Sequence, residues 1–143
     1  MLIVVRGIPA PQGSKTAFVV KGRAILTEAS KRTKPWRQDV KGIAFEVRAG
    51  APPLDGPLVA RMVFTMPKPA SSPKTRRIFA MRKPDLSKLA RAIEDSLTDA
   101  GVIADDARIV EYSRLAKVFP NEDPEALDSP GVRITIEPLE AAA

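Results

Sequence analysis

Carboxylates gather between residues 83 and 112 of a chain whose formal net charge is +6. Three of them, Asp85, Asp105 and Asp106, suit a metal site, because Mg²⁺ binds one or two carboxylates together with waters and phosphate oxygens. Two such ions about 4 Å apart activate water and stabilise the leaving oxygen when a phosphodiester is hydrolysed. The residue types therefore predict metal-assisted hydrolysis as the chemistry of this segment.

The chain contains no cysteine and no histidine. Disulfides, zinc-thiolate sites and thiol nucleophiles are therefore excluded, and the usual general base and the usual transition-metal ligand are missing as well. Any metal must be held by oxygen atoms, which favours a hard ion. We expect Mg²⁺ as the cofactor, with Mn²⁺ as its substitute.

Each acidic residue also has an explanation that needs no metal. Asp85 is a good helix N-cap, and Asp105-Asp106 is an ordinary turn signal in front of a strand. Arg91 precedes Asp95 by four residues, the spacing of an ion pair on a helix. A solvated helix face would account for the remaining acids, Glu94, Asp95 and Asp99.

Helix geometry limits which carboxylates can meet. Asp95 follows Asp85 by ten residues, about 15 Å along a helix, so these two cannot share an ion within one chain. A helix from 85 to 100 is roughly 22 Å long, and residues 101–106 reach about 20 Å when fully extended. Asp106 therefore meets its own Asp85 only if the connection runs straight back along the helix. Otherwise it meets the Asp85 of a second subunit.

Hydropathy patterns predict the elements that position these residues. A helix begins near Pro35 and ends before Gly50. Its predicted apolar face is Trp36, Val40, Ile43, Ala44 and Val47. Short β-rich or alternating runs predict strands at 2–8, 17–20, 23–26, 58–66, 107–118 and 132–139, the second and third forming a hairpin.

A second helix is predicted to start at Asp85 and to stop at Gly101. Its apolar stripe is Leu86, Leu89, Ala90, Ile93, Leu97 and Ala100. The resulting order, β-ββ-α-β-α-β-β, predicts one α+β domain over residues 1–143, with two main helices packed on a mixed β-sheet. Residues 140–143 are expected to be a frayed tail.

Charge is segregated along the chain. Residues 61–91 hold nine Lys or Arg and one acid, whereas residues 92–143 hold four Lys or Arg and twelve acids. A sequence pI near 9.9 with clustered basic residues indicates a polyanionic partner, most often nucleic acid, although a basic surface kept for solubility has the same composition. The segment 67–84, with four prolines and six basic residues, is predicted to be a basic mobile loop.

No apolar run approaches the ~20 residues of a membrane span, and the first residues lack the organisation of a signal peptide. We therefore expect a cytoplasmic protein that has no contact with a membrane.

The segment from Lys83 to Val110 resembles the RusA family of Holliday junction resolvases, which is common in bacteriophages. It reads KPDLSKLAR, then DSL at 95–97, Gly101, and Asp105-Asp106 followed by Ile109-Val110. The parts occur in the family's order and spacing. The resemblance implies a RusA-like homodimer that uses Mg²⁺ to cut two opposing strands of a four-way DNA junction, in a phage-infected or prophage-bearing host.

The resemblance also implies roles for single residues. Asp85 matches the first family aspartate and Asp106 the essential downstream one, with Asp105 as its neighbour. Arg91 falls where the family has a basic residue linked to catalysis.

Ser87 departs from the family pattern, because a second aspartate is expected there. A neutral hydroxyl is a weak ligand for a hard ion. The site either works with Asp85, Asp105 and Asp106 alone, or recruits another carboxylate such as Glu94 or Glu111, or cuts poorly. The last case leaves a junction-binding accessory of recombination or packaging as the alternative function; a basic structural module is a further one.

Phosphate contacts are expected from a group of basic residues, because four-way junctions are recognised by shape and backbone more than by sequence. Phe79 lies in the basic loop and is a candidate for stacking on bases, whereas Trp36 lies on an apolar helix face and is expected in the core. The candidate DNA contacts are Lys15, Lys34, Arg37, Lys74, Arg76, Arg77, Arg82, Lys83 and Lys88.

Overall fold

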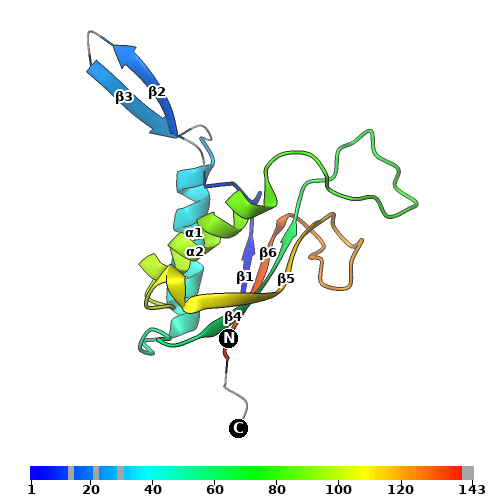
Figure 1. Cartoon of the computed structure of the whole chain (residues 1–143). Helices are drawn as coiled ribbons and strands as arrows, with labels where there is room; N and C mark the ends of the chain where they lie inside the picture. Colours follow the sequence, from blue (N-terminus) through cyan, green and yellow to red (C-terminus); the bar gives the residue numbers. More distant parts are fainter. Residues whose placement is uncertain (13–14, 21–22, 29–30, 140–143) are drawn as a thin grey trace.

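The structure, a computed structural model, describes residues 1–12, 15–20, 23–28 and 31–139. A four-stranded sheet has the order β1-β6-β4-β5, and a separate two-stranded sheet is the hairpin β2-β3 (Figure 1). The strands are β1 Leu2–Arg6, β2 Lys15–Val20, β3 Arg23–Glu28, β4 Leu58–Thr65, β5 Ile109–Val118 and β6 Gly131–Pro138. The helices are α1 Thr33–Arg48 and α2 Leu86–Asp99, and a 3₁₀ turn, η1, spans Asp106–Arg108.

This order of elements confirms the predicted α+β class, with a mixed sheet and two helices. β6 pairs antiparallel with both β1 and β4, whereas β4 and β5 run parallel. Parallel neighbours need a crossover, and α2 provides it. The predicted tail, 140–143, lies outside the described residues.

One face of the sheet carries the core. Val132, Ile134 and Ile136 alternate along β6 and are fully buried, as their spacing predicts. They meet Met62 and Phe64 of β4, which are also fully buried. Figure 1 shows α1 and α2 crossing on the same side of this sheet, so the apolar stripes of both helices close a single core.

The prediction for the apolar face of α1 was wrong at two positions. Trp36, Val40 and Ala44 are buried, but Ile43 and Val47 are 37% and 40% exposed. The buried apolar residues lie at i, i+4 and i+8, so they form a narrow stripe on one side of the helix. The helix ends at Ala49, which adopts the left-handed conformation, as does Gly50 after it.

The helix α2 is placed by its apolar stripe, as expected. Leu89, Ile93 and Leu97 are fully buried, and Gly101 follows the helix with φ +75, a conformation that glycine adopts readily. Asp85 occupies the N-cap position, but its side chain makes no capping hydrogen bond. The Asp85 carbonyl accepts the first backbone hydrogen bonds of the helix, from the N–H groups of Lys88 and Leu89, both at 3.1 Å.

An acidic loop between β5 and β6 is tied to the sheet by ion pairs. The Asp123 side chain is only 3% exposed, and Arg114 donates to both of its oxygens at 2.7 and 2.8 Å. The neighbouring Arg114 guanidinium therefore holds the pKa of Asp123 well below its usual range. Arg114 and Arg61 both bind Glu125 as well.

The basic segment 67–84 contains no helix or strand, and its predicted mobility stays a prediction. It runs beside the acidic loop at one end of the sheet (Figure 1) and contacts it through Lys68, Arg77 and the backbone N–H of Ile78. Glu122 pairs with Lys68 at 2.9 Å, and Arg77 pairs with Asp123 at 3.1 Å. Near its end, Lys117 of β5 donates to the backbone carbonyl of Pro84 at 2.8 Å.

We predict that Gly131→Ala destabilises the fold by about 2 kcal/mol, because overpacking a filled site forces neighbouring atoms apart. A Cβ there would lie 2.4 Å from the Val5 carbonyl oxygen and 2.8 Å from Leu127 Cδ1. Urea unfolding measures the change. Gly42→Ala is the matched control: a Cβ on this glycine of α1 meets nothing within 4 Å, and the helix should gain about 1 kcal/mol. Equal effects of the two changes would contradict the packing described for β1 and β6.

Candidate active site

Asp106 lies against the second half of α2. It opens η1, and its carboxylate accepts a hydrogen bond from the Thr98 hydroxyl. The Asp106 carboxylate also lies close to Asp95, which is one turn before Thr98 on α2. Burial and the neighbouring Asp106 carboxylate together raise the pKa of Asp95. The carboxylates of Asp95 and Asp106 therefore lie next to each other, and a positive charge between them would be favourable.

Glu94 adds a third carboxylate beside this pair. Burial raises its pKa, while a hydrogen bond from the Tyr112 hydroxyl opposes the rise; Asp106 and Asp95 raise the pKa further through their charges. Burial and the hydrogen bond to Glu94 raise the pKa of Tyr112 in turn. The interpretation of Glu94 and Asp95 as a solvated helix face was therefore wrong, because both are half-buried.

Basic side chains border these carboxylates. The charges of Arg37 and Arg91 both lower the pKa of Asp95, though less than its neighbours raise it. Arg37 reaches across from α1 to pair with Asp99 at 3.3 Å. Arg91 is exposed and influences Glu94 as well, so it lies where a basic residue can approach a phosphate held near the carboxylates.

Asp105 points into its own turn. One of its oxygens accepts the Ala107 N–H at 2.7 Å and so caps η1. This matches the turn signal recognised in the sequence. The two adjacent aspartates therefore make different contacts: Asp105 caps the turn, and Asp106 faces α2.

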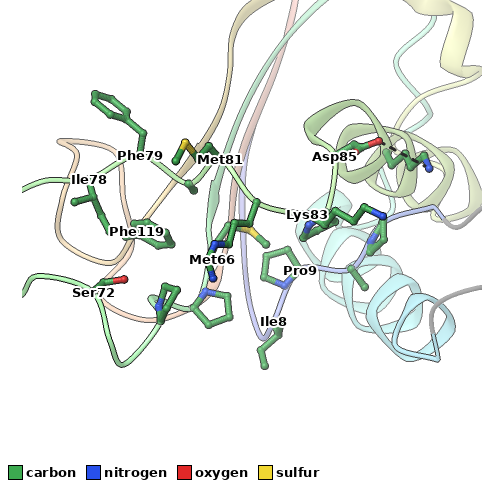
Figure 2. Close-up of a pocket in the computed structure, with 18 of the residues that line it drawn as sticks. Ile8, Pro9, Met66, Ser72, Ile78, Phe79, Met81, Lys83, Asp85 and Phe119 are labelled. Carbon is green, nitrogen blue, oxygen red and sulfur yellow. Dashed lines mark ion pairs between the residues drawn. The ribbon is translucent and has the colours of Figure 1, made fainter.

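Asp85 lies at the opposite end of α2. Its side chain is 58% exposed, and it forms an ion pair with Lys88 at 3.9 Å (Figure 2). Asp106 contacts Thr98 and Asp95, and Asp95 is about 15 Å along the helix from Asp85. The connection after α2 thus does not return Asp106 to its own Asp85. Among the described residues, no three acidic side chains converge as a group able to hold a metal ion.

The strand directions explain why Asp85 and Asp106 lie apart. Because β4 and β5 are parallel, α2 must run from the end of the sheet where β4 finishes back to the end where β5 starts. Asp85 follows the end of β4, and Asp106 precedes the start of β5. Of the two extra carboxylates considered in place of an aspartate at 87, Glu94 lies beside Asp106. Glu111 is next to Tyr112 on a strand and therefore faces the other way.

The predicted DNA contacts separate into groups. Lys15 belongs to β2, but its side chain lies outside the described residues. Lys34 is exposed on α1, and Lys74 is exposed in the basic segment. Trp36 is 3% exposed and belongs to the core, as expected. Five further predicted contacts line a groove that ends at Asp85: Arg76, Arg77, Arg82, Lys83 and Lys88. Arg37 is not among its lining residues.

A protein-family model described as endodeoxyribonuclease RusA matches residues 7–137. The chain belongs to the RusA family. No curated protein matches it. The family match begins directly after β1 and runs almost to the end of β6, so it includes both helices and the carboxylates near Asp106. In the described part of this RusA-family chain, no helix is long and apolar enough to cross a membrane.

Sequence reasoning did not anticipate the pairing of Asp95 with Asp106 or the role of Tyr112. The sequence did contain a signal for the pairing of Asp95 with Asp106, because Asp95 is part of the DSL group of the family pattern. Nothing in the sequence indicated that Tyr112 would reach Glu94, because that contact depends on how β5 lies against α2.

We predict that Asp95→Asn stabilises the protein at pH 7 by less than about 1 kcal/mol, because an amide can donate to Asp106 without adding charge. The folded-state pKa of Asp95 is raised, so its ionisation costs stability above the unfolded pKa near 3.9 and costs nothing below it. Urea unfolding at pH 7 and pH 4 should show the gain only at pH 7. Asp39→Asn, on the exposed side of α1, is the control. A destabilised Asp95→Asn at pH 7 would contradict the like-charge pair.

Proposed function

We propose that this RusA-family protein is a Mg²⁺-dependent endonuclease that resolves four-way DNA junctions as a homodimer, in the cytoplasm of a phage-infected or prophage-bearing bacterium. The observation that carries the proposal is the carboxylate cluster around Asp106 within a chain that matches an endodeoxyribonuclease family. The pKa values of Glu94 and Asp95 are both raised by burial and by the neighbouring Asp106 carboxylate, although the protein has a net charge of +6; such an arrangement is costly unless the site serves a cation.

The residues of one chain supply part of a divalent-cation site. Asp106 and the neighbouring Asp95 offer oxygen ligands, and a cation would offset the negative charge of Asp106 that raises the pKa of Asp95; no third acidic side chain among the described residues converges with them to hold a metal ion. A bound Mg²⁺ supplies an activated water and neutralises charge on the leaving oxygen. In the proposed site Asp106 and Asp85 hold the ion, with Asp105 adjacent, while Arg91 approaches the scissile phosphate.

A complete site requires Asp85 as well, and the fold keeps it at the other end of α2. We therefore place Asp85 and Asp106 of each site on different subunits. In a twofold dimer, one subunit's Asp85 meets the partner's Asp106, and the reverse pair forms a second, equivalent site. Two sites related by a twofold axis are what paired, symmetric cuts in opposing strands need.

Phosphate binding is assigned to the basic residues near Asp85 and to Lys34 and Lys15. Arg76, Arg82 and Lys83 are exposed and form no ion pair with any other described residue, so they are available for a polyanion. Arg37 pairs with Asp99 near the acidic cluster, so its contribution would be close to the reacting phosphate.

Complementation between two inactive variants tests this arrangement. We predict that Asp85→Asn and Asp106→Asn each reduce junction cleavage in Mg²⁺ by at least a hundredfold, because each removes a charged ligand. When the two are mixed and allowed to exchange subunits, the heterodimer keeps one intact site, since its unmodified Asp85 and Asp106 come from different chains. Denaturing gels should then show single nicks without paired cuts.

Mixing each variant with itself is the control and should give no nicks. No recovery in the heterodimer would refute the shared site, and undiminished cleavage by both single variants would refute the nuclease itself. Binding of the intact junction in Ca²⁺ shows that the variants still recognise DNA.

Ser87 permits a gain-of-function test. It is exposed in the first turn of α2, two residues after Asp85. We predict that Ser87→Asp lowers the Mg²⁺ concentration needed for half-maximal cleavage, by up to tenfold, because it adds a carboxylate beside Asp85. Ser87→Asn, similar in size but neutral, is the matched control. Loss of cleavage in Ser87→Asp alone would contradict the assignment of this position to the metal site.

A further inference from the structure

A groove of about 1060 Å³ lies between the segment 66–85 and the residues that follow β1. Figure 2 shows its walls: Ile8 and Pro9 on one side, and Met66, Phe119 and Met81 on the other. Asp85 stands at one end. The groove is therefore continuous with one half of the proposed catalytic site but is not part of it.

The lining combines apolar walls with positive charge. Six of the lining residues are Arg or Lys, and Asp85 is the one acid among them. Arg82 and Lys83 are exposed and lie next to one another, on the approach to Asp85. An occupant with matching chemistry is an anion that also carries flat, apolar surface. This combination describes a nucleotide strand whose bases are unpaired.

Phe79 supplies a surface on which such a base can stack. It is 73% exposed, and its ring points away from Ile78 and Phe119 (Figure 2). Arg77, which is also paired with Asp123, places its guanidinium 5.2 Å from the ring centroid, so the ring already takes part in the kind of cation–π contact that accompanies base stacking. Met81, 91% exposed, lies two residues further along the same segment.

These exposed apolar side chains cost the free protein hydration energy and contribute nothing to its core. Ile78, between them and the sheet, is held by its backbone N–H, which donates to Glu122 at 2.9 Å. The segment is thus fixed on the side of the acidic loop while the Phe79 ring stays in solvent. This is the geometry of a stacking platform on an anchored loop.

We infer that this groove binds a short stretch of unpaired DNA, with Phe79 stacking on a base and the Arg and Lys residues contacting the adjoining phosphates. The inference deepens the proposed function, on which it rests, because the strands at a four-way branch point lose stacking partners there. Duplex DNA is excluded as the occupant at Phe79, because its bases already stack on one another and cover both of their faces.

Fluorescence provides a direct test. The native Trp36 is buried, so the F79W variant adds an exposed indole at the tip of the loop. Titration of full-length F79W with a twelve-nucleotide oligo(dT) in Ca²⁺ should quench its emission, as base stacking on an indole does. The matched control is F45W, because Phe45 is also exposed and also lies under an arginine, Arg48, but on α1 outside the groove. Absence of quenching in F79W, or equal quenching in F45W, would overturn the inference.

Affinity gives a second measurement. Fluorescence anisotropy with labelled oligo(dT) should show binding roughly tenfold weaker for Phe79→Ala, with Phe79→Tyr close to the original protein and Phe45→Ala unchanged. A twelve-base-pair duplex should bind Phe79→Ala and the original protein equally. If Phe79→Ala weakened duplex binding as much as oligo(dT) binding, unpaired DNA would be the wrong occupant.

The proposed nuclease activity and the proposed binding of unpaired DNA in the groove can be refuted independently. Both binding experiments are made without cleavage, so an inactive protein can still show Phe79-dependent capture of oligo(dT). Conversely, a protein that cuts junctions but binds oligo(dT) equally with and without Phe79 keeps its proposed function and loses the groove. Phe79 is exposed, so its variants should unfold at the temperature of the original protein, which circular dichroism confirms or refutes.

Discussion

The rigid length of α2 constrains everything else about this site. Its buried stripe locks the helix to the sheet, and a helix rises 1.5 Å per residue whatever its sequence. Asp85 at one end and Asp95 with Asp106 towards the other are therefore held apart by packing that also forms the core. No side-chain rotation spans such a separation. A site that needs both ends must be completed from outside the chain, which ties proposed catalysis to dimer formation.

Electrostatics follow from the same arrangement. The carboxylates near Asp106 lie where burial raises their pKa, so the fold spends stability on holding them together. In the acidic loop between β5 and β6, neighbouring groups lower the pKa of the acids instead of raising it. Asp123 and Glu125 are paired with arginines that depress their pKa, and these pairs fasten the acidic loop to β4 and β5. Neighbouring groups therefore raise the pKa of the acids near Asp106, whereas the ion-paired acids of the loop serve the structure.

The basic segment 67–84 is held in position by the acidic loop between β5 and β6. Glu122 and Asp123 hold it through Lys68, Arg77 and the Ile78 backbone, and Lys117 holds its end close to Asp85. A long segment rich in proline and charge cannot bury enough apolar surface to place itself. The acidic loop supplies the missing contacts. The positive charges and Phe79 are thus presented on the side of the protein where Asp85 begins α2.

Local patterns in the sequence determined the elements of this protein. Alternation in β6, the stripe of α2 and the glycine at 101 each depend on residues a few positions apart, so the order of strands and helices was predictable. The family motif is also a short-range pattern, and on that basis the sequence predicted Asp85 and Asp106 as site residues. Only the tertiary structure decided that Asp106 meets Asp95 and that Glu94 meets Tyr112. Those contacts join elements whose relative placement depends on the packing of the whole core. The hydropathy pattern along the chain does not show in which direction the crossover through α2 runs between β4 and β5.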